Sequence, residues 1–152
     1  MPKIDIDAIP LDTGTGYPPQ FRAAIAGRAR KRLGPAAGLS QFGVNLCRLP
    51  PGVASSQRHW HAAEDEFVYV LEGEVVLCEE TGETVLRAGD AAAWKAGVAD
   101  GHSLVNRSDR DAVVLEVGTK APVETVDYPG VDMQMRRDAQ GSRYVRRSGE
   151  PF

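Results

Sequence analysis

Three histidines carry the clearest chemical signal in this chain, and two of them are separated by a single residue. Because residues i and i+2 of a strand point to the same face, a strand over residues 57–62 would aim His59 and His61 at one point. Glu66 can return to that point after a turn, and His102 follows a second strand-rich stretch. Three imidazole nitrogens and one carboxylate oxygen suit a divalent transition metal. We therefore predict that these four residues bind one metal ion.

Other side chains near this set have weaker signals. Gln57 shares the strand parity of the paired histidines and is a candidate for lining the pocket. Trp94 could edge the same pocket, with packing in the core as its alternative. We interpret Glu64, a competitor of Glu66 for the metal, as an exposed loop residue. The chain has no fourth histidine, and the sequence places no further acidic residue beside the four candidate ligands. No catalytic acid or base is therefore assigned.

From residue 41 onward, short apolar segments alternate with tight turns. Residues 41–49 alternate apolar and polar side chains, and residues 72–73 and 80–83 are typical of hairpin turns. The further strand candidates are residues 66–71, 75–77, 84–86, 91–94, 103–105, 112–117, 133–136 and 143–147. Many short strands at roughly ten-residue spacing predict an all-β barrel or jelly roll.

The first forty residues are less regular. Residues 1–19 are rich in Pro, Gly, Asp and Thr, so we expect an extended N-terminal arm. Residues 20–33 have apolar side chains every fourth position, as in a helix, but Arg28 to Leu33 also reads as a strand. Because the chain that follows is β-structure, we interpret residues 20–33 as a strand.

The segment 66–71 has apolar side chains on both faces and is expected to be covered on both sides. Phe67, Tyr69 and Leu71 point away from the lumen of the predicted barrel. The second sheet wall, the N-terminal arm or a partner subunit could cover them, since an exposed apolar patch of this size is a liability. Closed two-fold dimers are the commonest assembly, and we predict a homodimer.

Composition limits the remaining possibilities. A length of 152 residues fits one domain, and 42% hydrophobic residues are enough for one core. The net charge of -3 argues against general nucleic-acid binding, and no apolar stretch is long enough to span a membrane. The N-terminus lacks the apolar core of a signal peptide, so we expect a cytoplasmic protein with Cys47 and Cys78 reduced.

Two groups of basic residues could bind phosphate or nucleic acid. Their spacing instead favours solvent-facing strand positions. The groups are Arg28, Arg30, Lys31 and Arg32, and Arg136, Arg137, Arg143, Arg146 and Arg147.

At the histidines the sequence resembles the cupins, whose core is defined by two motifs. The first combines a Gly, a His-x-His pair, a Glu and a second Gly, and the second combines a Gly, Pro-x-Gly, a His and an Asn. The matching residues are Gly52, His59, His61, Glu66 and Gly73, then Gly89, Gly97, His102 and Asn106. Lys95 stands where Pro is usual, and four residues rather than two separate Gly97 from His102.

The resemblance implies a cupin-type antiparallel barrel over residues 40–118, with an arm over 1–39 and a C-terminal extension with a hairpin over 119–152. It implies one divalent metal, which could be Fe, Mn, Ni, Co or Zn. It also implies a small-molecule ligand. A metal-dependent enzyme of the dioxygenase, isomerase or lyase type is the favoured function, and a non-catalytic small-molecule or sugar sensor is the alternative. Neither motif specifies a reaction, so whether the protein is an enzyme stays open.

Overall fold

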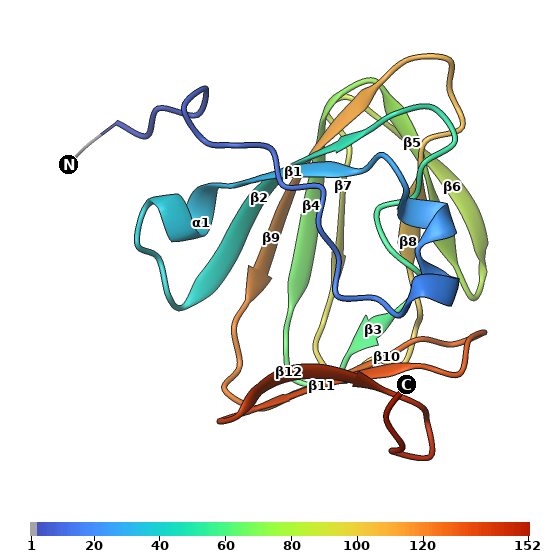
Figure 1. Ribbon diagram of the computed structural model, residues 1–152. Coiled ribbons are helices and arrows are strands. Elements are labelled where there is room, and N and C mark those ends of the chain that lie inside the picture. Colours follow the sequence, from blue (N-terminus) through green and yellow to red (C-terminus); the bar gives the residue numbers. More distant parts are fainter. Residues whose placement is uncertain (1–2) are drawn as a thin grey trace.

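The computed structural model describes residues 3–152, which form twelve strands in three antiparallel sheets (Figure 1). The large sheet contains, in spatial order, β1 (Ala29–Arg32), β2 (Phe42–Leu49), β9 (Ala112–Thr119), β4 (Glu66–Glu72) and β7 (Ala91–Trp94). The three-stranded sheet contains β6 (Gly82–Arg87), β5 (Glu74–Glu79) and β8 (Ser103–Val105). The C-terminal sheet contains β12 (Gly141–Val145), β11 (Gln134–Asp138), β10 (Glu124–Asp127) and β3 (Trp60–His61).

The main core lies between the large sheet and the three-stranded sheet. The inward side chains of β2, β4 and β9 alternate with partly exposed ones, as the period-2 pattern predicts. Leu49, Val70 and Val114 are fully buried and belong to the same core cluster as Val75 and Leu77 of β5. This packing fixes the orientation of β4, which begins at Glu66.

A second core holds the C-terminal sheet against the barrel. Tyr17 packs edge-on against both Tyr128 and Tyr144, and Met133 is fully buried beside them. In Figure 1 the C-terminal sheet lies below the large sheet and closes that end of the molecule. Since β3 belongs to this sheet, the closure also fixes the position of His61.

The N-terminal segment is extended and crosses the barrel before the first strand. Asp12 pairs with Arg30 of β1 in an isolated bridge, and the chain then forms two short 3-10 helices, Pro19–Phe21 and Ala23–Ile25. A single helical turn, α1 (Leu33–Ala36), follows β1. The prediction of one strand over residues 20–33 is therefore wrong except at its end.

The outer face of β4 is exposed in the single chain. Phe67, Tyr69 and Leu71 remain about 40% exposed, whereas Val68 and Val70 face the core and are buried. The expectation that residues 66–71 are covered on both sides is wrong for one subunit, since neither the described N-terminal segment nor the second sheet covers this face.

One turn depends on glycine. Gly73 joins β4 to β5 with a φ of 74°, and a Cβ atom there would lie 2.8 Å from the carbonyl oxygen of Asp111. Within residues 3–152, no helix is both long enough and apolar enough to cross a membrane.

Candidate metal centre

The three histidines and Glu66 meet inside the barrel, although they come from separate elements. His61 lies on β3, His59 and His102 form an isolated bridge, and Glu66 is the first residue of β4. The Oε2 atom of Glu66 lies 3.6 Å from Nε2 of His59, 3.6 Å from Nε2 of His61 and 2.9 Å from Nε2 of His102. The structure thus brings together all four residues that the sequence predicts.

Two of the imidazoles are oriented by backbone carbonyl groups behind them. Nδ1 of His59 lies 3.1 Å from the carbonyl oxygen of Gln57, and Nδ1 of His102 lies 3.3 Å from that of Asp100. In each ring Nε2 faces Glu66 and is the atom that would ligate a metal. With a metal on Nε2, Nδ1 would carry the hydrogen and donate it to the carbonyl oxygen, which can only accept.

His61 has carboxylates behind it instead. Its Nδ1 atom is buried without a hydrogen-bond partner among the described residues, and it lies 3.6 Å from Oε2 of Glu64 and 3.6 Å from Oε2 of Glu124. The Glu124 side chain is fully buried and accepts hydrogen bonds from the backbone N–H groups of Ala62 and Ala63. His61, Glu64 and Glu124 form a second group that could hold a metal ion, next to the group of His59, His61 and Glu66.

Glu64 is buried rather than exposed, so the prediction of an exposed loop residue is wrong. Its carboxylate forms an ion pair with Arg137 of β11 and accepts a hydrogen bond from the backbone N–H of Ala121. Burial raises the pKa of Glu64 above its ordinary value. These contacts arise because the C-terminal sheet folds over the loop between β3 and β4.

The protonation states at neutral pH favour metal binding. Burial lowers the pKa of His61 below its ordinary value, and the neighbouring His59 lowers it further. Burial alone would raise the pKa of Glu66, but hydrogen bonds from His102 and His59 hold it well below its ordinary value. Glu66 is therefore ionised and His61 neutral at neutral pH, the states that a divalent metal requires.

The two predicted pocket residues have different positions. The ring of Trp94 stacks on His102 with 3.7 Å between centroids and lines the cavity beside the metal centre. Gln57 is not among the residues that line this cavity, and its side-chain amide donates to the carbonyl oxygen of Phe21. The prediction for Gln57 is wrong because the strand begins only at Trp60, so the parity of His61 does not extend back to residue 57.

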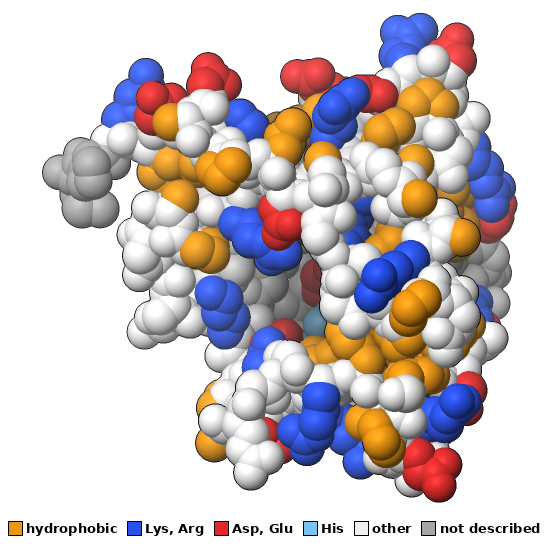
Figure 2. Space-filling model, in the orientation of Figure 1, with side chains coloured by type: hydrophobic (Ala, Val, Ile, Leu, Met, Phe, Trp, Pro, Cys, Tyr) orange, Lys and Arg blue, Asp and Glu red, His pale blue; other side chains and the backbone are white. Residues whose placement is uncertain are grey.

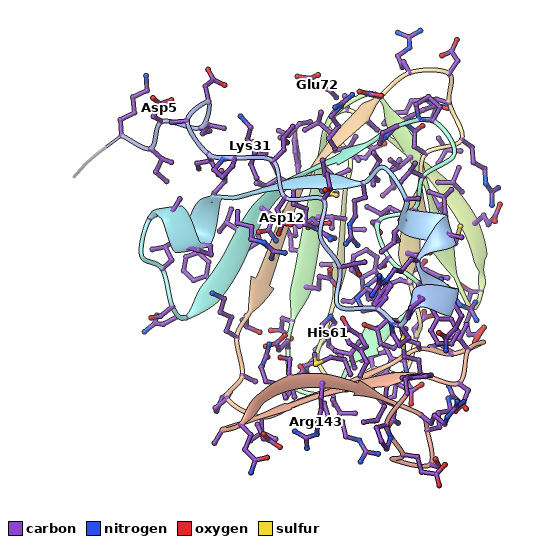
Figure 3. All side chains as sticks on the ribbon, in the orientation of Figure 1. Asp5, Asp12, Lys31, His61, Glu72 and Arg143 are labelled. Atoms are coloured by element: carbon purple, nitrogen blue, oxygen red, sulfur yellow. The ribbon has the colours of Figure 1, made fainter. Side chains whose placement is uncertain are left out.

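A cavity of about 230 Å³ lies beside the four residues and has His59, Glu66 and His102 in its wall. Figure 2 shows this face hollowed near the middle, with a histidine and acidic side chains inside and basic side chains around the opening. Figure 3 shows His61 between the large sheet and the C-terminal hairpin. A second recess of about 270 Å³ reaches His61 and Glu66 from the side of β9.

Three charged residues of the cavity wall were not assigned to the cavity from the sequence. Arg30 and Glu116 form a two-fold ion pair, with both nitrogen–oxygen distances at 2.7 Å, and Arg28 is buried nearby. The prediction that the first basic group faces solvent is wrong for Arg28 and Arg30. Glu116 did have a signal, because it shares the inward parity of Ala112 and Val114 on an otherwise apolar strand.

Comparison with known proteins places this site in a family. A profile of the cupin domain matches residues 45–118. A sugar phosphate isomerase from a cupin superfamily, from Silicibacter pomeroyi, is 49% identical, with 99% of this chain and 96% of that chain covered and a TM-score of 0.95. A protein provisionally named a sugar phosphate isomerase, from Acidithiobacillus ferrooxidans, is 30% identical, with 82% and 80% covered and a TM-score of 0.74.

A more distant structure shares the fold alone. A predicted oxalate decarboxylase from Thermotoga maritima is 23% identical, with 78% of this chain and 99% of that chain covered and a TM-score of 0.62. No curated protein matches the chain. The antiparallel sheets, the matched region and the similarity to the first two structures confirm the fold class and the resemblance inferred from the two motifs. This chain belongs to the cupin superfamily.

Proposed function

We propose that this protein is a metal-dependent isomerase that acts on a small phosphorylated sugar. The observation that carries the proposal is the convergence of three imidazole Nε2 atoms on Glu66 at the wall of a cavity. The reaction class follows the two more similar solved structures, both of which are named sugar phosphate isomerases.

The residues present fit a divalent metal. His59, His61, His102 and Glu66 would hold it, since each Nε2 atom lies within 3.6 Å of Oε2 of Glu66 and the Nδ1 side of each ring already faces an acceptor. A metal bound there supplies Lewis-acid polarisation of a carbonyl oxygen. This donor set accepts Fe, Mn, Ni, Co or Zn, so the native metal has to be measured.

Glu116 is the residue that we assign to proton transfer. Isomerisation of an aldose to a ketose moves a proton between neighbouring carbons and requires a basic group beside the sugar. Of the described residues that line the cavity, Glu116 is the carboxylate outside the proposed donor set. The ion pair with Arg30 orients both oxygens, and each keeps a lone pair that can accept a proton from the substrate.

Proton NMR of a panel of aldose phosphates in D₂O tests the proposal directly. Metal-loaded protein should convert one of them to a ketose phosphate and place solvent deuterium on the carbon next to the carbonyl. The Glu116→Gln variant should lose activity by about 100-fold or more while retaining its metal. Asp111→Asn is the matched control, because Asp111 also pairs with an arginine but lies outside the cavity.

Two results would contradict the proposal. If the protein binds metal and sugar phosphates but converts none of the panel, the non-catalytic sensor becomes the better interpretation. If Glu116→Gln exchanges the substrate proton as fast as the unaltered protein, Glu116 is not the proton carrier.

A further inference from the structure

Arg28 is a buried cation in the wall of the metal-centre cavity. It precedes β1, is 8% exposed and lines the same cavity as His59, Glu66 and His102. Arginine is rarely buried to this extent without a carboxylate partner, because removing its charge from water is costly. The environment of Arg28 therefore needs an explanation.

Its partners in the structure are neutral. Nη1 of Arg28 donates to the carbonyl oxygen of Ser55 at 2.6 Å, and Nη2 lies 3.4 Å from that of Gly14. Within residues 3–152, no carboxylate forms a salt bridge with it. A guanidinium has five N–H groups, so donors remain for a further partner.

The neighbouring arginines are different, although they line the same cavity. Arg30 is bound by both oxygens of Glu116, and Arg32 is paired with Asp12 at 2.6 Å. The carboxylates near β1 are thus already used by these two side chains. Burial lowers the pKa of Arg28, and the adjacent positive charge of Arg30 lowers it further. A bound anion would relieve both effects.

Arg28 is also connected to the metal centre by polar groups. Ser55, whose carbonyl accepts from Arg28, is followed by Ser56, whose Oγ lies 3.1 Å from Nδ1 of His59. Arg28 and the candidate metal ligands His59, Glu66 and His102 line one cavity of only about 230 Å³. A sugar-sized molecule inside it would therefore contact both Arg28 and these ligands.

We propose that Arg28 is the residue that binds the phosphate group of the substrate, while the metal centre binds the carbonyl end. A guanidinium forms two parallel charge-assisted hydrogen bonds to phosphate oxygens, which fixes orientation as well as affinity. The choice of phosphate rests on the proposed function, whereas the anion site itself rests on the burial and the neutral partners of Arg28.

Isothermal titration calorimetry with D-ribose 5-phosphate, D-ribose, inorganic phosphate and D-gluconate tests this assignment. The unaltered, metal-loaded protein should bind ribose 5-phosphate at least about tenfold more tightly than ribose. Arg28→Gln should lose this advantage, and Arg28→Lys should keep the charge and part of the affinity. Arg48→Gln is the matched control, since it removes the same charge from an exposed residue outside the cavity.

Thermal melting of each variant shows whether it is folded. If Arg28→Gln does not fold, Arg28→Lys still allows the test. A folded Arg28→Gln or Arg28→Lys variant that binds ribose 5-phosphate like the unaltered protein overturns the proposal. Preferential binding of gluconate overturns phosphate as the ligand. The double variant His59→Ala/His61→Ala separates this proposal from the metal-dependent function, because Arg28 should still bind inorganic phosphate when the metal site is removed.

Discussion

Nδ1 of His61 lies 3.6 Å from Oε2 of Glu124, a carboxylate that is fully buried beneath the ring. The opposite nitrogen, Nε2, lies 3.6 Å from Oε2 of Glu66. One imidazole therefore lies between two carboxylates, one on the cavity side and one behind. A carboxylate behind a metal-binding histidine fixes the tautomer and increases the basicity of the ligating nitrogen. Glu124 thus has the position of a residue that orients His61 without contacting the substrate.

Replacing Glu124 should weaken metal binding without abolishing it. Glu124→Gln retains the side-chain shape but removes the charge behind His61, so we expect about 10- to 100-fold lower metal affinity. Competition with a chromophoric chelator measures this change. Glu72→Gln on the exposed end of β4 is the control and should bind metal normally. An unchanged affinity in a folded Glu124→Gln protein would show that Glu124 does not support the site.

The stability of the metal-free protein should decrease in mild acid. Burial, followed by the neighbouring His59, lowers the pKa of His61 below its ordinary 6.5. The unfolded chain therefore binds more protons than the folded chain between these two values, and the free energy of unfolding rises with pH there. This contribution of His61 is complete above about pH 6.5 and is lost as the pH falls through the lower, folded value.

Glu66 should extend the same trend further into acid. Its folded pKa is well below the ordinary 4.5, because hydrogen bonds from His102 and His59 outweigh the effect of burial. Its contribution is complete above pH 4.5 and disappears as the pH falls toward the folded value. Melting temperatures recorded with a chelator present from pH 8 to about pH 2 measure both effects, and His61→Asn should flatten the upper part of the curve. A melting temperature that rises as the pH falls from 6.5 would contradict these assignments.

The exposed face of β4 supports the predicted homodimer. Phe67 lines an apolar hollow on this face together with Phe42 and Ala93, and Tyr69 and Leu71 continue the apolar surface along the strand. Light scattering at micromolar concentration should give twice the chain mass of 16.4 kDa. Phe67→Glu should shift the protein toward the monomer, whereas Val123→Glu, at an exposed apolar residue elsewhere, should not. A monomer mass for the unaltered protein at that concentration would refute the dimer.

The residues of the candidate metal centre could be identified from the sequence because they belong to short motifs. His59 and His61 are two residues apart, and the cupin-like motifs add Glu66 and His102. The alternation of apolar and polar residues likewise predicts β2, β4 and β9. The predicted strand over residues 57–62 is too long, because only Trp60–His61 pairs with β10 and residue 57 lies outside this strand pairing.

The residues around the metal centre depend on contacts that a linear pattern does not show. Glu64 is buried by Arg137, which is 73 positions away, and Arg28 is buried where the N-terminal segment crosses β1. In the sequence Glu64 falls in an expected loop and Arg28 in a group of basic residues, so both looked solvent-exposed. The inward parity of Glu116 was visible, but its partner Arg30 comes from a segment whose structure the sequence left ambiguous.

Elemental analysis of protein purified without added metal tests the central claim most directly. We expect about one equivalent of a single divalent transition metal per chain. The His59→Ala/His61→Ala variant should contain almost none while its far-UV circular dichroism spectrum remains that of a β-protein. A folded double variant that retains one equivalent would show that the metal binds elsewhere and would contradict the account.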